Sequence, residues 1–327
     1  MIERHDSVIT EPGMYDIPAA NYHADDITSE PTLSNSIVRL LDSGASPRHV
    51  TGKHPRLMRP EWCEFAESGT DAQKLGQVIH GMLLGVDGDY VAKDPDEFRI
   101  KDGSPAKSWG AKEASIWKDY IEASGKIVIA RETERKARLA ADGMLDAIRV
   151  EFPTWDDGVS ERTLVWRWQL NDGGHVWCRA RPDRILMNCE CESRPKRHKH
   201  IFDAKSTGKP VYSDQALDAK IGLEGWDIQH VFYVAGARAV FGEDVPFTFV
   251  VEESFPPFEP WIVDIPDEWL ALTRQRVDVA AQTFGRCLRE GSWPGRARRR
   301  IVVGAPPNWL VSRWEESLEI ATSKENS

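Results

Sequence analysis

The chain has 327 residues, of which 41% are hydrophobic, and this suffices to bury the core of one large domain or two small ones. The formal net charge of −10 argues against a protein that coats nucleic acid along its length, but it does not exclude an enzyme with an acidic metal site and a local basic channel. No apolar run is long enough to span a membrane, the polar start MIERHDSVIT lacks a signal-peptide core, and five cysteines without framework spacing indicate a protein of the reducing cytoplasm.

Helices are predicted in the first half of the chain. Apolar residues recur at helical spacing there, and the first helix begins at a typical capping residue, either Ser34 or Asn35. The predicted helices span residues 33–41, 71–85, 109–123 and 132–150.

A period of two then replaces the helical period and predicts strands. The order of helices, consecutive strands, helices and further strands favours an α/β (α+β) fold, a central mixed sheet flanked by helices in a single domain over 1–327. Strands are predicted at 163–170, 175–187, 200–205, 247–252 and 261–264, with a turn at 171–174, and helices at 214–221, 226–241 and 267–290.

The strand at 200–205 carries Asp203-Ala204-Lys205. Residues two apart on a strand point to the same face, so a carboxylate and an ammonium would lie side by side. Asp183 is expected on the neighbouring strand, directly after Pro182, which lacks an N–H and makes that strand irregular. Two converging aspartates suit Mg²⁺, which takes one or two carboxylates and leaves its other positions to water and phosphate. With a lysine beside them, they predict phosphodiester hydrolysis.

An acid-x-Lys triplet alone is a weak signal. Three occur, at 134–136, 203–205 and 218–220, and the first and third fall in predicted helices, where residues two apart diverge. The alternative for the strand triplet is a surface salt-bridge ladder on an edge strand, and the pattern alone leaves both open.

Three further residues could serve the same site. Gln229 and Tyr233 are four apart and share a helix face, and His80 lies on a predicted apolar helix. The ordinary alternatives are a surface glutamine, a tyrosine packed in the core and a buried histidine with satisfied hydrogen bonds.

Two basic clusters, 194–200 and 296–300, could line a channel for phosphates or could be solvated loops. The first is flanked by Cys189-x-Cys191 and contains His198-x-His200, four residues of the kind that bind Zn²⁺. Their spacing differs from that of a zinc knuckle, so we expect a plain β-hairpin with a basic tip.

Four short motifs follow one another along the chain: Gly76-x-x-x-His80, Arg181-Pro182-Asp183, Asp203-x-Lys205 and Gln229-x-x-x-Tyr233. In this order they resemble the RecB/RecE-like nucleases of the PD-(D/E)xK superfamily, above all the RecE-type exodeoxyribonuclease VIII nuclease domain of phages and prophages. The segments 14–18, 22–23, 33–36, 46–47 and 306–309 also look like that family. Asp203 stands where many superfamily members have Glu, although RecE-type enzymes often have Asp.

The resemblance implies a PD-(D/E)xK, restriction-endonuclease-like core at 71–265, after a family-specific segment at 1–60 and before a C-terminal helix and tail at 266–327. It implies Mg²⁺ as cofactor, with Mn²⁺ as a substitute, and the cysteine spacing predicts no iron–sulfur cluster. The implied roles are metal ligation by His80, Glu161, Asp183 and Asp203, catalysis by Lys205, and positioning by Gln229 and Tyr233.

The resemblance also implies the reaction. Family members digest linear double-stranded DNA from 5′ ends, form ring-like homo-oligomers and work with a single-strand annealing protein, here in a bacterial host cell. Two other hypotheses remain: a catalytically silent DNA-binding protein of the nuclease fold, and a structure-specific endonuclease.

Overall fold

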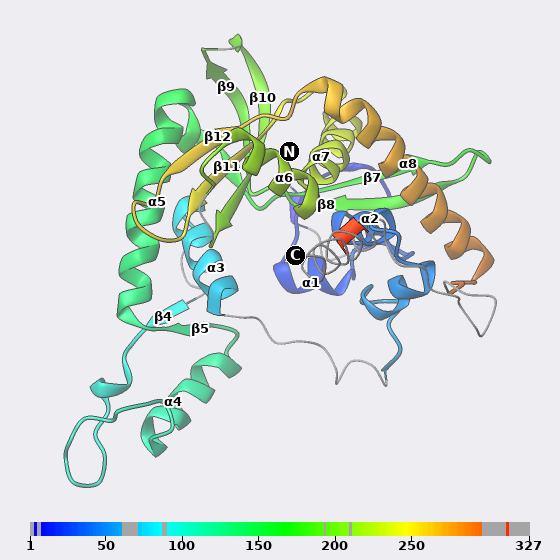
Figure 1. The fold of residues 1–327 in the computed structure, drawn as a ribbon. Helices are drawn as coiled ribbons and strands as arrows, with labels where there is room; N and C mark the ends of the chain where they lie inside the picture. The colour runs from blue at the N-terminus through cyan, green and yellow to red at the C-terminus, as the bar shows by residue number, and fades with distance from the viewer. Residues whose placement is uncertain are drawn as a thin grey trace, which may run out of the picture.

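A computed structural model describes residues 3–4, 8–60, 71–86, 90–192, 194–208, 211–295 and 312–313. Its strands form two mixed five-stranded sheets, where the sequence predicts one central sheet, and helices cover them (Figure 1). None of the helices in these ranges is both long and apolar enough to cross a membrane.

The first sheet joins the N-terminal segment to the middle of the chain. A predicted hairpin forms its centre, with antiparallel strands on either side of the turn at 171–174, and N-terminal strands flank it. In spatial order the sheet contains β1 (Glu3–Arg4), β2 (Gly13–Asp16), β7 (Thr163–Gln169), β8 (His175–Ala180) and β3 (Leu33–Ser34).

The second sheet holds the acid-x-Lys strand at its centre. That strand pairs parallel with one neighbour and antiparallel with the other. In spatial order the sheet contains β12 (Pro260–Val263), β11 (Phe247–Glu253), β10 (Arg194–Thr207), β9 (Arg184–Cys191) and β6 (Val159–Ser160). A separate pair of parallel strands is formed by β4 (Tyr90–Ala92) and β5 (Ile127–Ile129).

The prediction of one strand over 175–187 is wrong. The chain leaves the first sheet after Ala180 and enters the second at Arg184, so β8 and β9 belong to different sheets. Pro182 lies at this junction, where its missing N–H could not contribute to a ladder. The irregularity expected at this proline is therefore a change of sheet.

The predicted helices are present; those at 226–241 and 267–290 have the predicted ends, and the ends of the others differ by up to three residues. Ser34 is the N-cap residue of the first long one, although its hydroxyl contacts Ser36 and does not bond a backbone N–H. The α-helices are α1 (Ala19–Ala24), α2 (Asn35–Asp42), α3 (Asp71–Leu84), α4 (Lys112–Ala123), α5 (Arg131–Glu151), α6 (Asp214–Glu224), α7 (Trp226–Phe241) and α8 (Asp267–Glu290), and 3₁₀ turns lie at Pro47–Gly52, Pro95–Glu97 and Trp155–Asp157.

Both faces of the second sheet are covered, which explains why every residue of β11 is buried, without alternation. Phe249 and Val251 belong to a core shared with α2, α7 and α8, whereas Val250 and Phe202 belong to a core shared with α3 and α5. Figure 1 shows α5 along one side of this sheet and α7 and α8 on the other.

Helix α7 packs closely on the first sheet. A Cβ atom at Gly236 would lie 2.7 Å from the Trp166 ring of β7, so only glycine permits this approach. The Phe232 ring, four residues before Gly236, lies 4.8 Å from that of Trp166, centroid to centroid. This contact fixes the helix that carries Gln229 and Tyr233.

Candidate active site

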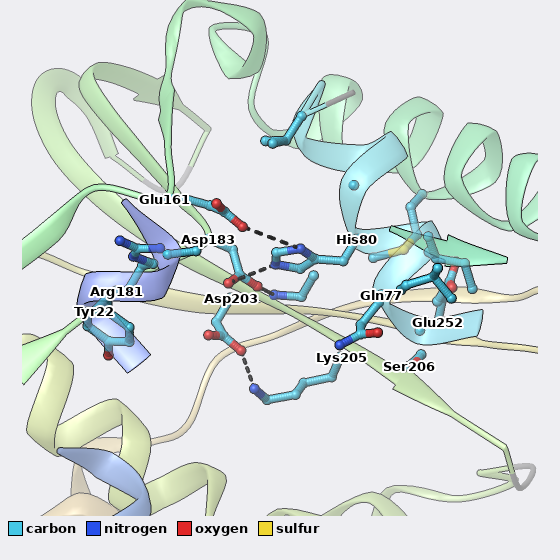
Figure 2. Close-up of a pocket in the computed structure, with 18 of the residues that line it drawn as sticks. Tyr22, Gln77, His80, Glu161, Arg181, Asp183, Asp203, Lys205, Ser206 and Glu252 are labelled. Carbon is cyan, nitrogen blue, oxygen red and sulfur yellow. Dashed lines mark hydrogen bonds and ion pairs between the residues drawn. The ribbon is translucent and has the colours of Figure 1, made fainter. Parts of the chain in front are cut away.

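A cavity of about 830 Å³ opens where the two sheets, α1 and α3 meet. Six of the seven residues proposed from the sequence line it, and the seventh, Gln229, lies behind one of them. Figure 2 shows the side chains of His80, Glu161, Asp183, Asp203 and Lys205 gathered in this pocket. The polar residues of its wall are Tyr22, His23, Gln77, His80, Glu161, Arg181, Asp183, Asp203, Lys205, Ser206, Tyr233 and Glu252.

Asp183 lies at the junction between the sheets, one residue before β9. Its backbone N–H donates to the Phe202 carbonyl over 3.1 Å, which ties it to β10 although it lies outside the strand. Its Oδ2 accepts from the Ala204 N–H at 2.7 Å. Its Oδ1 lies 2.9 Å from His80 Nε2.

Asp203 and Lys205 lie side by side on β10, as expected for residues two apart on a strand. The Lys205 ammonium donates to Asp203 Oδ2, and Gln229 on α7 donates from Nε2 to Asp203 Oδ1 over 2.6 Å. The other acid-x-Lys triplets, at 134–136 and 218–220, lie in α5 and α6. The alternative of an edge ladder is wrong, because β10 is a central strand and Asp203 is only 4% exposed.

The two aspartates have matching environments. In each, a neutral N–H donor binds one oxygen, and a basic side chain faces the other: His80 beside Asp183 and Lys205 beside Asp203. The neutral donors fix the orientation of the two carboxylates.

His80 reaches the pocket because α3 approaches β10 closely. A Cβ atom at Gly76, one turn earlier, would lie 2.9 Å from Ser206 Oγ, so a larger residue there would require the Ser206 hydroxyl to turn away. His80 is therefore at the pocket wall, and the alternative of a core histidine is wrong. Burial lowers the pKa of His80, but the charge and hydrogen bond of Asp183, with the charges of Asp203 and Glu161, raise it overall to about 9.

Glu161 takes a backbone conformation that non-glycine residues rarely adopt, with φ of 51°. Its N–H donates to the Asp183 carbonyl over 3.1 Å, and its Oε1 lies 4.0 Å from His80 Nδ1. Strained backbone of this kind clusters at functional sites.

The carboxyl of Asp203 is buried beside another carboxylate. Burial first, and then the charge of Asp183, raise its pKa to about 6, against the opposing charge and hydrogen bond of Lys205. A cation between the aspartates would remove this repulsion.

Gln229 and Tyr233 lie on one face of α7, as predicted. Gln229 is 5% exposed, so the surface alternative is wrong, and its partner is Asp203. Tyr233 is buried at the pocket wall, and its hydroxyl interacts with the Gln229 side chain. Burial first, then the charges of Tyr22, Asp203 and Asp183, raise the pKa of Tyr233 well above its usual value.

Sequence reasoning assigned no role to several polar residues of the pocket wall, among them Tyr22, Arg181 and Glu252. Tyr22 lies on α1, and the guanidinium carbon of Arg181 lies 4.5 Å from the centroid of its ring. Arg181 also donates a hydrogen bond to the Ile17 carbonyl. Both residues lie in segments that resemble the nuclease family, at 22–23 and 181–183, so the resemblance could have indicated a role for them.

Glu252 on β11 is the third. Its side chain faces the pocket although the residue is fully buried, and neither carboxylate oxygen has a hydrogen-bond partner within the described part of the chain. Burial raises the pKa of Glu252 to about 8. One signal was present in the sequence, a glutamate at the end of the predicted strand 247–252; the pairing of this strand with the acid-x-Lys strand comes from the structure.

The basic cluster at 194–200 contributes none of the described residues that line the pocket. In the 194–200 cluster, which lies on the β9–β10 hairpin, Arg197 pairs with Glu190 and Lys199 with Glu243. The 296–300 cluster and the 306–309 segment fall outside the described residues.

The donors in the pocket suit a hard divalent cation. Asp183 and Asp203 offer two oriented carboxylates, the number that Mg²⁺ usually takes from a protein. Among the described residues, no three His, Cys, Asp or Glu donors in this pocket lie within 4.8 Å of one another, so it is not a closed protein cage. Such an open arrangement leaves positions for water and a phosphate.

No family model and no curated protein matches the sequence. A crystal structure from Eubacterium rectale described as a "Putative exonuclease" is similar, with 13% identity and a TM-score of 0.49 over 90% of this chain and 97% of that one. A second, of SSO0001, has 10% identity and a TM-score of 0.25 over 64% of this chain and 86% of that one. At this level of similarity, neither carries an argument about this chain.

Proposed function

We propose that this protein is a metal-dependent nuclease that hydrolyses phosphodiester bonds of DNA, with a PD-(D/E)xK core. The observation that supports it best is the meeting of Asp183, Asp203 and Lys205 in one cavity, each aspartate held by a neutral donor. Paired carboxylates beside an ammonium suit a reaction in which negative charge builds on phosphate oxygens.

Asp183 and Asp203 would hold Mg²⁺ or Mn²⁺, with His80 and Glu161 as the outer wall of the same site. When bound, the cation would polarise the phosphoryl oxygen and lower the pKa of the attacking water. Lys205 places an ammonium where it offsets charge on the phosphate or orients that water. Gln229 fixes the Asp203 carboxylate, and Tyr233 closes the wall behind it.

The motif order supports a narrower proposal. By resemblance to RecE-type enzymes, the substrate is linear double-stranded DNA, digested from 5′ ends in phage-type recombination in the cytoplasm of a bacterial host. A homo-oligomer and a single-strand annealing partner belong to the same proposal.

The chain contains its own matched control, because the tripeptide Asp-Ala-Lys occurs both at 203–205 and at 218–220. We expect end-labelled linear duplex to be degraded with Mg²⁺ and not with EDTA. Lys205→Ala and Asp203→Asn should each lose activity by about 10²-fold or more, whereas Lys220→Ala and Asp218→Asn on α6 should not. Circular dichroism checks folding.

Near-normal degradation by folded Lys205→Ala protein would refute the nuclease site. Rapid cutting of supercoiled plasmid would favour an endonuclease, and DNA binding without cleavage at any divalent metal concentration would favour the catalytically silent alternative.

A further inference from the structure

A second group of metal-ligating side chains lies on the β9–β10 hairpin, outside the pocket. Cys189 of β9 is the cross-strand partner of His198 on β10, and a register shift separates His198 from His200. One donor atom from each of these three residues lies within 4.8 Å of the other two. His200 precedes Asp203 by three residues, or about 10 Å along a strand, so this group is separate from the aspartates.

Hydrogen bonds fix which nitrogen of His200 carries the proton. His200 Nε2 lies 2.8 Å from Thr248 Oγ1, and the Thr248 hydroxyl donates its only hydrogen to Asp264 Oδ1 over 2.5 Å. Thr248 therefore accepts from His200 Nε2–H. In neutral His200 this leaves Nδ1 as a lone pair that points to the cluster.

His198 is fixed in the opposite sense. Its Nδ1 lies 2.9 Å from the Lys196 carbonyl, which can only accept, so Nδ1 carries the proton and Nε2 is the lone pair. His198 Nε2 and His200 Nδ1 lie 3.4 Å apart. When both imidazoles are neutral, two acceptor nitrogens therefore face each other, and a positive centre between them would offset their repulsion.

One proton between the two nitrogens would satisfy them but would not engage the Cys189 sulfur, which also approaches His200 Nδ1. The Cys189 thiol is a weak donor whose sulfur is 3.9 Å from His200 Nδ1, and it can serve only one of the two nitrogens. A metal ion bound by both nitrogens and the sulfur would satisfy all three atoms.

We infer that Cys189, His198 and His200 form a Zn²⁺ site that joins β9 to β10. Tetrahedral zinc with typical bond lengths sets its nitrogens about 3.3 Å apart and sulfur about 3.6 Å from nitrogen; the distances here are 3.4 and 3.9 Å. A thiolate with imidazoles favours zinc over Mg²⁺. Binding releases the thiol proton to solvent, and water takes the fourth position.

The surroundings match those of a zinc-bound histidine. Such a histidine commonly donates its other N–H to a group that is itself held by a hydrogen bond, as His200 does through Thr248 to Asp264. The spacing alone predicts a plain hairpin; the fixed tautomers and the sulfur distance lead to the zinc proposal.

The test uses untagged full-length protein. We expect about one zinc per chain by mass spectrometry after dialysis against excess Mg²⁺. When the zinc-free protein is titrated with Co²⁺ in excess Mg²⁺, a thiolate-to-cobalt charge-transfer band should appear. Cobalt at the aspartates has no sulfur ligand and gives no such band, so this result does not depend on the nuclease proposal.

Matched variants locate the site. Cys189→Ala and His198→Gln should lose the band, whereas Cys287→Ala, at another buried cysteine, and His175→Gln, at an exposed histidine, should keep it. Partly exposed His198 can be replaced with little risk to folding, which keeps the test decisive if Cys189→Ala misfolds. The proposal would be overturned if folded wild-type protein contained no zinc and gave no cobalt band. It would also be overturned if the band remained in His198→Gln.

Discussion

Gln229 on α7 donates a hydrogen bond over 2.6 Å to the one oxygen of Asp203 that does not face Lys205. Gln229→Ala removes that bond and lets the carboxylate rotate. If Asp203 binds Mg²⁺, the Mg²⁺ concentration for half-maximal nuclease activity should rise about 10- to 100-fold, and saturating Mg²⁺ should restore most of the rate. Titration of activity with Mg²⁺ measures both, with exposed Gln215→Ala as control. An unchanged Mg²⁺ requirement would show that Gln229 does not position a metal ligand.

Two helical glycines should respond to alanine with opposite signs. At Gly236, a Cβ would lie 2.7 Å from the buried Trp166 ring, whereas at Gly222 on α6 the nearest contact would be an ordinary 3.6 Å, to Trp269. Gly236→Ala should destabilise the protein by about 1–3 kcal/mol, and Gly222→Ala should stabilise it by up to about 1 kcal/mol. Urea unfolding measures both. Equal effects would mean that α7 can move off β7 without cost.

Glu161 allows stability and activity to be separated. Its φ of 51° costs a non-glycine residue on the order of 1–2 kcal/mol. Glu161→Gly should therefore be about 1 kcal/mol more stable than Glu161→Gln, which keeps the strain and loses the charge. Both should lose activity, because the carboxylate beside His80 is gone. If Glu161→Gly proved less stable than Glu161→Gln, the positive φ at residue 161 would carry no net backbone strain.

Glu252 predicts a pH dependence of stability. Its pKa is about 8 in the folded protein against an ordinary 4.5, so between these values the folded state holds one more proton. The free energy of unfolding then falls as pH rises, by up to about 1.4 kcal/mol per pH unit. Relative to wild type, Glu252→Gln should gain stability from pH 5 to pH 8. Urea unfolding in EDTA across this range checks it, and parallel curves for the two proteins would contradict it.

The sequence predicted local features well. The repeated Asp-Ala-Lys shows why. The hydrophobic period of the surrounding residues alone assigned one copy to a strand and the other to a helix, and the structure places them in β10 and α6. The shared face of Gln229 and Tyr233 follows from their four-residue spacing in the same way.

Pairing between distant segments was less predictable. Apolar patterns on both sides of Pro182 look continuous, and nothing local tells the chain's two sheets apart. Glu252 was missed for a related reason, since an acid at the end of an apolar strand usually meets water. This one lies between β10 and β12, on a pocket wall that α3 and α5 also line, and is enclosed there.

The change of sheet at Arg181-Pro182-Asp183 places a pocket residue at the junction of the two sheets. Asp183 lies in the short connection between the sheets, and Asp203 lies on β10, the central strand of the second sheet. A ligand bound to both residues would join this connection to β10. A ligand bound to both carboxylates would therefore hold the junction between the two sheets in the position seen here.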